Sequence, residues 1–214
     1  MKKLLLLFAA LLVAGCGEKS SPEDSDSAID KPTGEPSADA VKPSPAEPPV
    51  AESPSEESSD NAPSLSDADV ERLLEEAVDM ESLEERDDLL YQDNKPYSGW
   101  VKMIHDSGQV QALGQFKDGK LDGLSTVWAG NGQKVKEGIW KDGKQDGPYT
   151  EWHANGQKAA EVTFKDTYPH GPWTRWHKNG QKKSEVTYQD DKQISGKYWN
   201  SKGEEVETEE EANE

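Results

Sequence analysis

The sequence contains a single cysteine, and hydrophobic residues make up only 32% of its 214 positions. One cysteine has no partner for an intramolecular disulfide, which excludes a disulfide-stapled domain. The one long apolar run, residues 4–13, is too short to span a bilayer as a helix. The sequence shows no Ser-His-Asp order, no metal-ligand spacing and no phosphate-cradling glycine loop. It therefore favours a non-catalytic protein without a cofactor or a metal.

The net charge of −19 is distributed unevenly along the chain. Residues 17–64 carry twelve acids against three bases, and residues 65–90 carry eleven against two. The tail at 204–214 has seven acids and no base, whereas residues 91–203 hold seventeen bases against thirteen acids. The acidity lies in the flanking segments, and the central region is mildly basic.

The first sixteen residues have the parts of an export signal. Lys2 and Lys3 precede the apolar run, and the small residues after it lead to Cys16. This ending resembles the lipobox of bacterial lipoproteins, which implies a signal peptide at 1–15 and a lipidated Cys16. The alternative is an ordinary cleaved signal with a chance cysteine. Because Gly17 follows and not aspartate, the resemblance implies a lipid-anchored protein of the cell envelope, at the outer membrane, and export makes nucleic acid a poor partner.

The segments that flank the central region differ in kind. Residues 16–64 hold nine of the thirteen prolines and few large apolar side chains, so we expect a disordered linker after the lipidated cysteine. Residues 65–90 are predicted to be an acidic helical segment, with Ser66 as the cap of a helix over 66–79. The apolar stripe of this helix is predicted to cover the first edge of a sheet. Residues 204–214 are expected to be a disordered acidic tail that is able to fold back onto lysines of the central region.

The central region, residues 91–203, repeats itself every 24 residues. The repeating positions include glycines, a glycine-glutamine pair and an aromatic: Gly99, Gly123, Gly147 and Gly171; Gly108, Gly132, Gly156 and Gly180; Phe116, Trp140, Phe164 and Tyr188. Three of the second glycines follow asparagine, which favours a tight type I′ turn between two strands. Asp-Gly links then lead to the next hairpin, although Thr167 replaces a link glycine and is expected to resist positive φ. The pattern predicts an all-β repeat fold, an elongated single-layer antiparallel meander of about ten strands.

These residues resemble a known family. The pattern Gly-x-Tyr/Trp-x-x-Trp-x-x-Asn-Gly-Gln-Lys, followed by an aromatic and Asp-Gly-Lys, is similar to the bacterial variant of MORN (membrane occupation and recognition nexus) repeats. The resemblance covers residues 91–203. It implies a binding or scaffolding role with protein or membrane partners and no shared catalytic residues. Proteins of this variant are often labelled antitoxin-like, a role that fits poorly with export.

Strand alternation predicts two aromatic ladders on opposite faces of the sheet. One ladder comprises Trp128, Trp152 and Trp176; the other comprises Phe116, Trp140, Phe164 and Tyr188. Lys134, Lys158 and Lys182 recur beside the first ladder, and together these tryptophans and lysines are the candidate binding residues. The alternative is that the ladders only stiffen the sheet and the lysines only keep its surface solvated. A wider turn with a bulge would reverse the assignment of faces.

Three functions are compatible with the sequence. The favoured one is a membrane-anchored module that displays its repeat sheet to an envelope protein. Direct attachment to anionic lipid or to peptidoglycan is the second, and an antitoxin-like or immunity-like binder is the third. His153 and His177 occupy equivalent repeat positions, which favours a structural or surface role for both over a unique active site.

Overall fold

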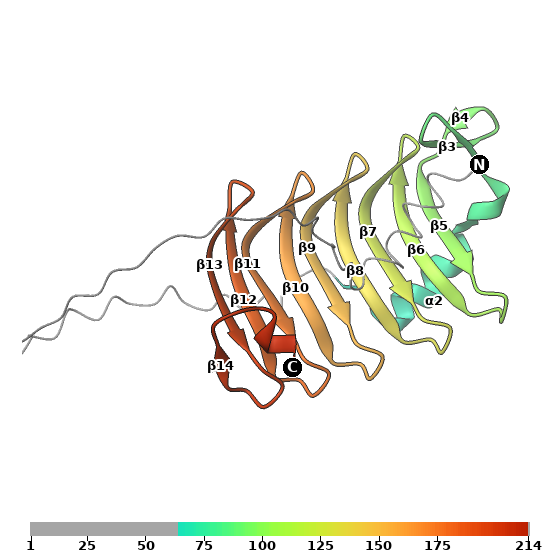
Figure 1. The fold of residues 1–214 in the computed structure, drawn as a ribbon. Helices are drawn as coiled ribbons and strands as arrows, with labels where there is room; N and C mark the ends of the chain where they lie inside the picture. Colours follow the sequence, from blue (N-terminus) through green and yellow to red (C-terminus); the bar gives the residue numbers. More distant parts are fainter. Residues whose placement is uncertain (1–63, 214) are drawn as a thin grey trace, which may run out of the picture. The chain divides into compact units, whose positions relative to one another are not determined.

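A computed structural model of the chain describes residues 64–213, so the predicted signal peptide and Cys16 lie outside the described residues. The described part is dominated by an eleven-stranded sheet in the order β1-β5-β6-β7-β8-β9-β10-β11-β12-β13-β14 (Figure 1). From β5 onward every strand pairs antiparallel with the next one along the chain. The predicted antiparallel repeat meander is therefore confirmed.

The repeat strands are eight or nine residues long, apart from the six-residue first strand. Their bounds are β5 (Gly99–Ile104), β6 (Val110–Lys117), β7 (Lys120–Trp128), β8 (Lys134–Lys141), β9 (Lys144–Trp152), β10 (Lys158–Lys165), β11 (Tyr168–Trp176), β12 (Lys182–Gln189) and β13 (Lys192–Trp199). The short strands β1 (Val78–Asp79) and β14 (Glu205–Val206) pair with β5 and β13 at the two ends.

The tight type I′ turns lie at the Asp-Gly links and not at the Asn-Gly pairs, where the sequence predicts them. The Asp-Gly links are two-residue turns with positive φ at both positions, as at Asp142 (50°) and Gly143 (82°), which is the type I′ signature. The Asn-Gly turns are wider. At Asn155-Gly156 only the glycine has positive φ (85°), and its N–H donates to the carbonyl oxygen of His153. This is a three-residue loop that ends in a left-handed glycine, so the predicted two-residue Asn-Gly turn is wrong.

The faces are nevertheless as predicted, because a bulge compensates for the wider turn. In the hairpin β9–β10, Trp152 pairs with Lys158, but Thr150 pairs with Glu161, so β10 has gained one residue. That extra residue restores the register expected from a two-residue turn. The sheet thus has a Trp128 face, which also carries Thr150 and Trp152, and a Phe116 face, which carries the alternate residues.

The third link adopts the conformation that its sequence disfavours. Thr167 has a φ of 77° beside Asp166 at 50°, in the turn position that glycine occupies in the first two links. Its N–H donates to the carbonyl oxygen of Gln145 at 2.8 Å, in the same way that Gly143 N–H donates to Leu121. Tertiary hydrogen bonding between successive links therefore overrides the backbone preference of a β-branched residue.

The segment before the repeats covers both faces of the first strands (Figure 1). Helix α2 (Asp67–Glu76) packs on the Trp128 face through Leu73, and Leu73 and the C-cap residue Ala77 join a cluster with Leu113 and Trp128. The first edge is covered by β1 and not by the helix, which corrects the predicted position. Only part of 65–90 is helical, because η2 (Met80–Ser82), β2 (Glu84–Arg86) and β3 (Leu89–Gln92) follow.

A second cluster fills the Phe116 face at the same end. Strands β2, β3 and β4 (Lys95–Pro96) form a separate three-stranded sheet, and Leu90 and Tyr97 from this region pack with Val101, Phe116 and Trp140. Leu90 and Val101 are fully buried. The apolar core of the described residues is therefore concentrated around the first repeats, where the sheet has cover on both sides.

The acidic tail is ordered where the sequence predicts disorder. After β14, residues Glu211–Asn213 form the 3₁₀ turn η3, and Ala212 is completely buried. Glu209 pairs with Arg175, and Lys183 Nζ donates to Asn213 Oδ1 at 2.6 Å. The tail thus folds back onto basic residues of the repeats, because strand pairing and these polar contacts offset its poverty in apolar side chains.

Candidate binding face

Two rows of side chains cross the Trp128 face from strand to strand. Cross-strand pairing places threonine and glutamate alternately in one row: Thr126, Glu137, Thr150, Glu161, Thr174 and Glu185. The neighbouring Trp–Lys row alternates tryptophan and lysine: Trp128, Lys134, Trp152, Lys158, Trp176, Lys182 and Trp199. The structure therefore brings together all six predicted tryptophans and lysines on one face.

Ion pairs tie the two rows together. The ammonium nitrogen of Lys134 lies 2.8 Å from Glu137, and that of Lys158 lies 3.1 Å from Glu161; Lys182 and Glu185 repeat the pair. Two residues three apart in a regular strand point to opposite faces, but a bulge after each lysine turns both side chains to the same face. Since each lysine already has a carboxylate partner, the row is less cationic than its lysine count indicates.

Lysine also contacts the tryptophan of the following repeat. Lys134 Nζ lies 5.6 Å from the ring centroid of Trp152, and Lys182 Nζ lies 5.7 Å from that of Trp199. Both distances fall within the range of a cation–π contact. The rows are therefore held in place by contacts that repeat with the sheet.

Exposure of the rows increases along the sheet. The lysine side chains are 24% exposed at Lys134, 42% at Lys158 and 44% at Lys182. Their glutamate partners rise in parallel, from 9% at Glu137 to 42% at Glu185. The face is thus closed at β8 and open from β10 to β12.

Two apolar residues that only the first repeat has explain where helix α2 packs on the sheet. Val110 and Leu113 stand 24 residues before Lys134 and Glu137, so the first repeat has apolar residues where later repeats have the ion pair. Leu113 is fully buried under α2, and Trp128 retains only 7% of its surface. Trp128 is consequently part of the core and is unavailable to a partner, unlike the half-buried Trp152 and Trp176.

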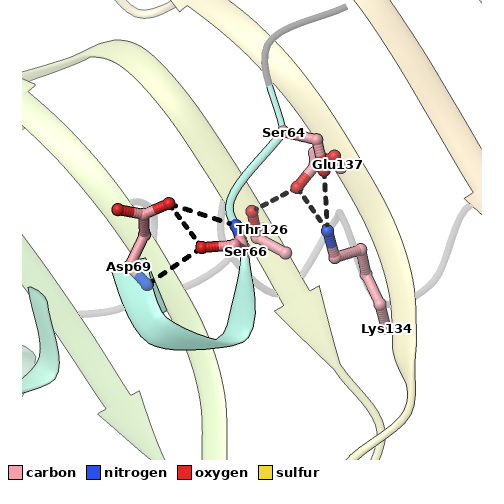
Figure 2. Close-up of polar contacts among 6 residues, drawn as sticks. All are labelled: Ser64, Ser66, Asp69, Thr126, Lys134 and Glu137. Atoms are coloured by element: carbon pink, nitrogen blue, oxygen red, sulfur yellow. Dashed lines mark hydrogen bonds and ion pairs between the residues drawn. The ribbon is translucent and has the colours of Figure 1, made fainter. Parts of the chain in front are cut away.

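Ser64, two residues before the cap of α2, contacts this face at Lys134 (Figure 2). Lys134 Nζ donates to Ser64 Oγ at 3.1 Å and also to the Glu137 carboxylate. The same carboxylate accepts a second hydrogen bond from Thr126 Oγ1 at 3.0 Å. Ser66 then caps α2 in a reciprocal capping box with Asp69. The hydrogen bonds from Ser66 lower the pKa of the Asp69 carboxyl, which keeps it ionised at the positive end of the helix.

The Phe116 face carries a different arrangement. Tyr149, Phe164, Trp173 and Tyr188 form a chain of aromatic contacts with ring centroids 5.7, 6.2 and 5.9 Å apart. Burial, with Glu151 beside the hydroxyl, raises the pKa of Tyr149. The hydroxyl donates to Glu151 at 2.6 Å. This face is therefore self-packed across β9–β12.

The histidines at equivalent repeat positions connect neighbouring hairpins. His105, His153 and His177 each place Nε2 within 2.8–3.1 Å of the carbonyl oxygen of a tryptophan in the next repeat. His153 and His177, for which the sequence favours a structural or surface role, thus each link two neighbouring hairpins. Within residues 64–213, no group of three or more His, Cys, Asp or Glu side chains is arranged to hold a metal, and no helix there is long and apolar enough to cross a membrane.

The hairpins that carry the open rows are also the ones that match a known family. Residues 145–166 and 169–190 match the MORN repeat variant. Each match covers one hairpin, β9–β10 or β11–β12, apart from the first residue of its first strand, and ends at the first aspartate of the following link. No curated protein matches the chain.

Several members of the Trp128 face were not predicted from the sequence. Trp199 extends the Trp–Lys row, and the glutamates at 137, 161 and 185 of the neighbouring row pair with its lysines, although none was named as a candidate. The Lys-x-x-Glu spacing recurs every 24 residues and was the available signal. Lys136, two residues after Lys134, lies on the Phe116 face, and its ammonium nitrogen is 3.4 Å from Glu151.

Proposed function

We propose that this chain is a lipid-anchored, non-catalytic interaction module of the cell envelope. Cys16 holds it to the membrane, and the MORN-variant hairpins present the Trp128 face to an envelope protein. The observation that carries the proposal is the open part of the Trp–Lys row, where half-buried Trp176 and Trp199 lie beside the 44% exposed Lys182. Tryptophan is enriched in protein–protein interfaces and among the residues that contribute most of their binding energy.

The binding surface is tested with two tryptophans of the same strand. Trp176 and Trp173 are both half-buried on β11 but face opposite sides of the sheet. Saturable binding of the full chain to one or a few proteins of solubilised envelope is expected to fall roughly 30-fold in Trp176→Ser, the loss typical of an interface hot spot. Trp173→Ser should bind as the parent does. Equal losses in both variants, with lowered melting temperatures, would show that the tryptophans only hold the sheet together.

The anchor is tested separately with Cys16→Ser. Metabolic labelling with palmitate should mark the parent chain and leave the variant unlabelled, and the variant should move to the soluble fraction because two or more acyl chains are needed for a stable anchor. A variant that stays with the membrane would contradict anchoring at Cys16.

Direct attachment to anionic lipid or peptidoglycan is the second candidate, favoured by the exposure of Lys158 and Lys182. Their glutamate partners oppose it, because each pair presents little net charge. Binding that collapses between low and high ionic strength would support the anionic polymer, and binding that persists would support the protein partner.

A further inference from the structure

The Trp128 face already holds one helix of this chain, and that helix lies across the strands. Lys102 on β5 donates to the carbonyl oxygen of Leu74 at 2.9 Å, and Lys134 on β8 donates to Ser64 at 3.1 Å. Three strand spacings of about 4.8 Å separate β5 from β8, or about 14 Å. Ten residues of helix, the length of α2, rise about 15 Å, nearly the same distance. Helix α2 therefore runs from β8 toward β5 and not along a strand (Figure 1).

The spacing of the repeats matches the spacing of helix turns. One repeat adds two strands, so equivalent side chains on the face recur about every 9.6 Å. Two turns of helix, about seven residues, rise about 10.5 Å. Val70 and Ala77, which are seven residues apart, both pack in the cluster with Leu113 and Trp128. A helix that crosses the strands thus presents the same side of itself to each successive repeat.

The open part of the Trp–Lys row continues this spacing beyond α2. Trp152, Trp176 and Trp199 are half-buried, and each is the last residue of its strand, β9, β11 or β13. Four strand spacings, about 19 Å, separate β9 from β13. A helix covers this distance in about thirteen residues. One helix of ordinary length is therefore able to contact all three tryptophans.

Backbone hydrogen bonding favours a helix over an extended segment on this face. Strands β9–β12 are each paired on both edges, so a segment that lies on the face contacts side chains and not strand edges. An extended segment there would bury backbone N–H and C=O groups without partners, whereas a helix satisfies most of these groups internally.

The lysines of the row supply polar contacts to a crossing helix. Lys134 donates to Glu137 and to Ser64, near the N-terminus of α2, at the same time (Figure 2). Lys158 and Lys182 are 42% and 44% exposed, and each has one glutamate partner. Because an ammonium group has three N–H donors, both have capacity for a second acceptor.

We propose that the open part of the Trp–Lys row binds an amphipathic α-helix of the partner protein, which lies across β9–β13 as α2 lies across β5–β8. Apolar residues about seven apart contact the three tryptophans. Hydroxyl or carboxylate side chains beside this apolar stripe accept hydrogen bonds from Lys158 and Lys182. This inference rests on the proposed function and specifies the form of the partner.

Photo-cross-linking from two positions of the row measures the conformation of the partner. A photoreactive amino acid replaces Lys158 in one full chain and Lys182 in another, and mass spectrometry of the products from intact cells identifies the captured residues. The two positions lie about 9.6 Å apart. A helix covers this distance in about six or seven residues, and an extended chain covers it in about three. The proposal predicts capture at sites about six or seven residues apart in one segment of one protein.

The outcomes separate this inference from the proposed function. A spacing of about three residues, or capture from two separate segments, would overturn the helix and leave the protein partner in place. Absence of a captured protein from both positions would contradict the partner and the helix together.

Position 134 is the matched control within the same row. Its lysine is only 24% exposed and already donates to Ser64, so a photoreactive group there should link to the chain itself and not to the partner. Partner capture at position 134 equal to that at position 182 would contradict binding on the open part of the row.

A synthetic peptide of the captured segment then tests its helical form. Proline at a central position should weaken binding to the full chain by roughly a hundredfold, because it removes a helix hydrogen bond and clashes with the preceding turn. Alanine at the same solvent-facing position should bind as the parent peptide does. Equal binding of the proline and alanine peptides would overturn the proposal.

Discussion

Replacing Leu113 with alanine should release helix α2 from the sheet. Leu113 is fully buried and packs with Leu73, Ala77 and Trp128 in the cluster that holds the helix. In later repeats a glutamate occupies the same place, at positions 137, 161 and 185. The contact between α2 and the first repeat therefore depends on the apolar character of this one position and of Val110 beside it.

The size of the effect follows from burial. Truncating a fully buried leucine to alanine costs about 3 kcal/mol, within a range of roughly 2–5 kcal/mol. A helix of ten residues is barely stable without packing, so a loss of this size in packing energy should undock it from the sheet. Since about 1.4 kcal/mol corresponds to a factor of ten, the docked population should fall relative to the undocked one by roughly a hundredfold.

Hydrogen exchange at the amides of residues 67–76 measures this directly. In Leu113→Ala their protection should fall by about two orders of magnitude, while β9–β12 keep theirs, because local opening and global unfolding are separable in repeat proteins. Leu121→Ala is the control: it removes the same atoms from the cluster on the opposite face and should leave α2 protected. Unchanged exchange of α2 in Leu113→Ala would refute the reasoning.

Three further outcomes are expected. Thr167→Asn should raise the free energy of unfolding by about 1 kcal/mol, because Asn94 shows that asparagine fits this turn position at positive φ. A thermal melt measures the change, and a lowered melting temperature would show that Thr167 is not strained. Burial raises the pKa of Tyr149, so the folded chain keeps this proton longer than the unfolded chain and stability should fall as the pH rises above about 10, less steeply in Tyr149→Phe. His177→Ala removes the contact to Trp199 and should cost about 1 kcal/mol in chemical denaturation; no change would mean that the contact is replaced by water.

The fold was predictable because the regular spacing of the repeat residues defines the strand register. Glycines and aromatics spaced by 24 fix hairpin length, and strand alternation then assigns the faces. The turn types were not predictable from dipeptides alone, since Asn-Gly and Asp-Gly both favour type I′ geometry. In this chain the Asp-links take that geometry, and the Asn-Gly pairs close wider loops whose extra residue is absorbed by the bulge in strands such as β10.

The candidate site was predictable in kind and less so in detail. The tryptophans and lysines at 24-residue spacing do lie on one face, but nothing in the spacing reveals that Trp128 is covered. That required comparison of the first repeat with the others at Val110 and Leu113, where the ion pair is missing. The ordered tail was missed for a different reason: composition predicts disorder, whereas Arg175 and Lys183 offer a specific docking place that composition does not describe.

In the proposed function, the open Trp–Lys row is the surface that meets a partner. A photoreactive amino acid at position 182 of the membrane-anchored full chain tests it most directly, with the same group at position 188 of the same strand, on the opposite face, as the comparison. The account predicts a discrete, saturable cross-linked protein from position 182 and none from position 188. Cross-linking from position 188 alone would place the partner on the Phe116 face and contradict the claim.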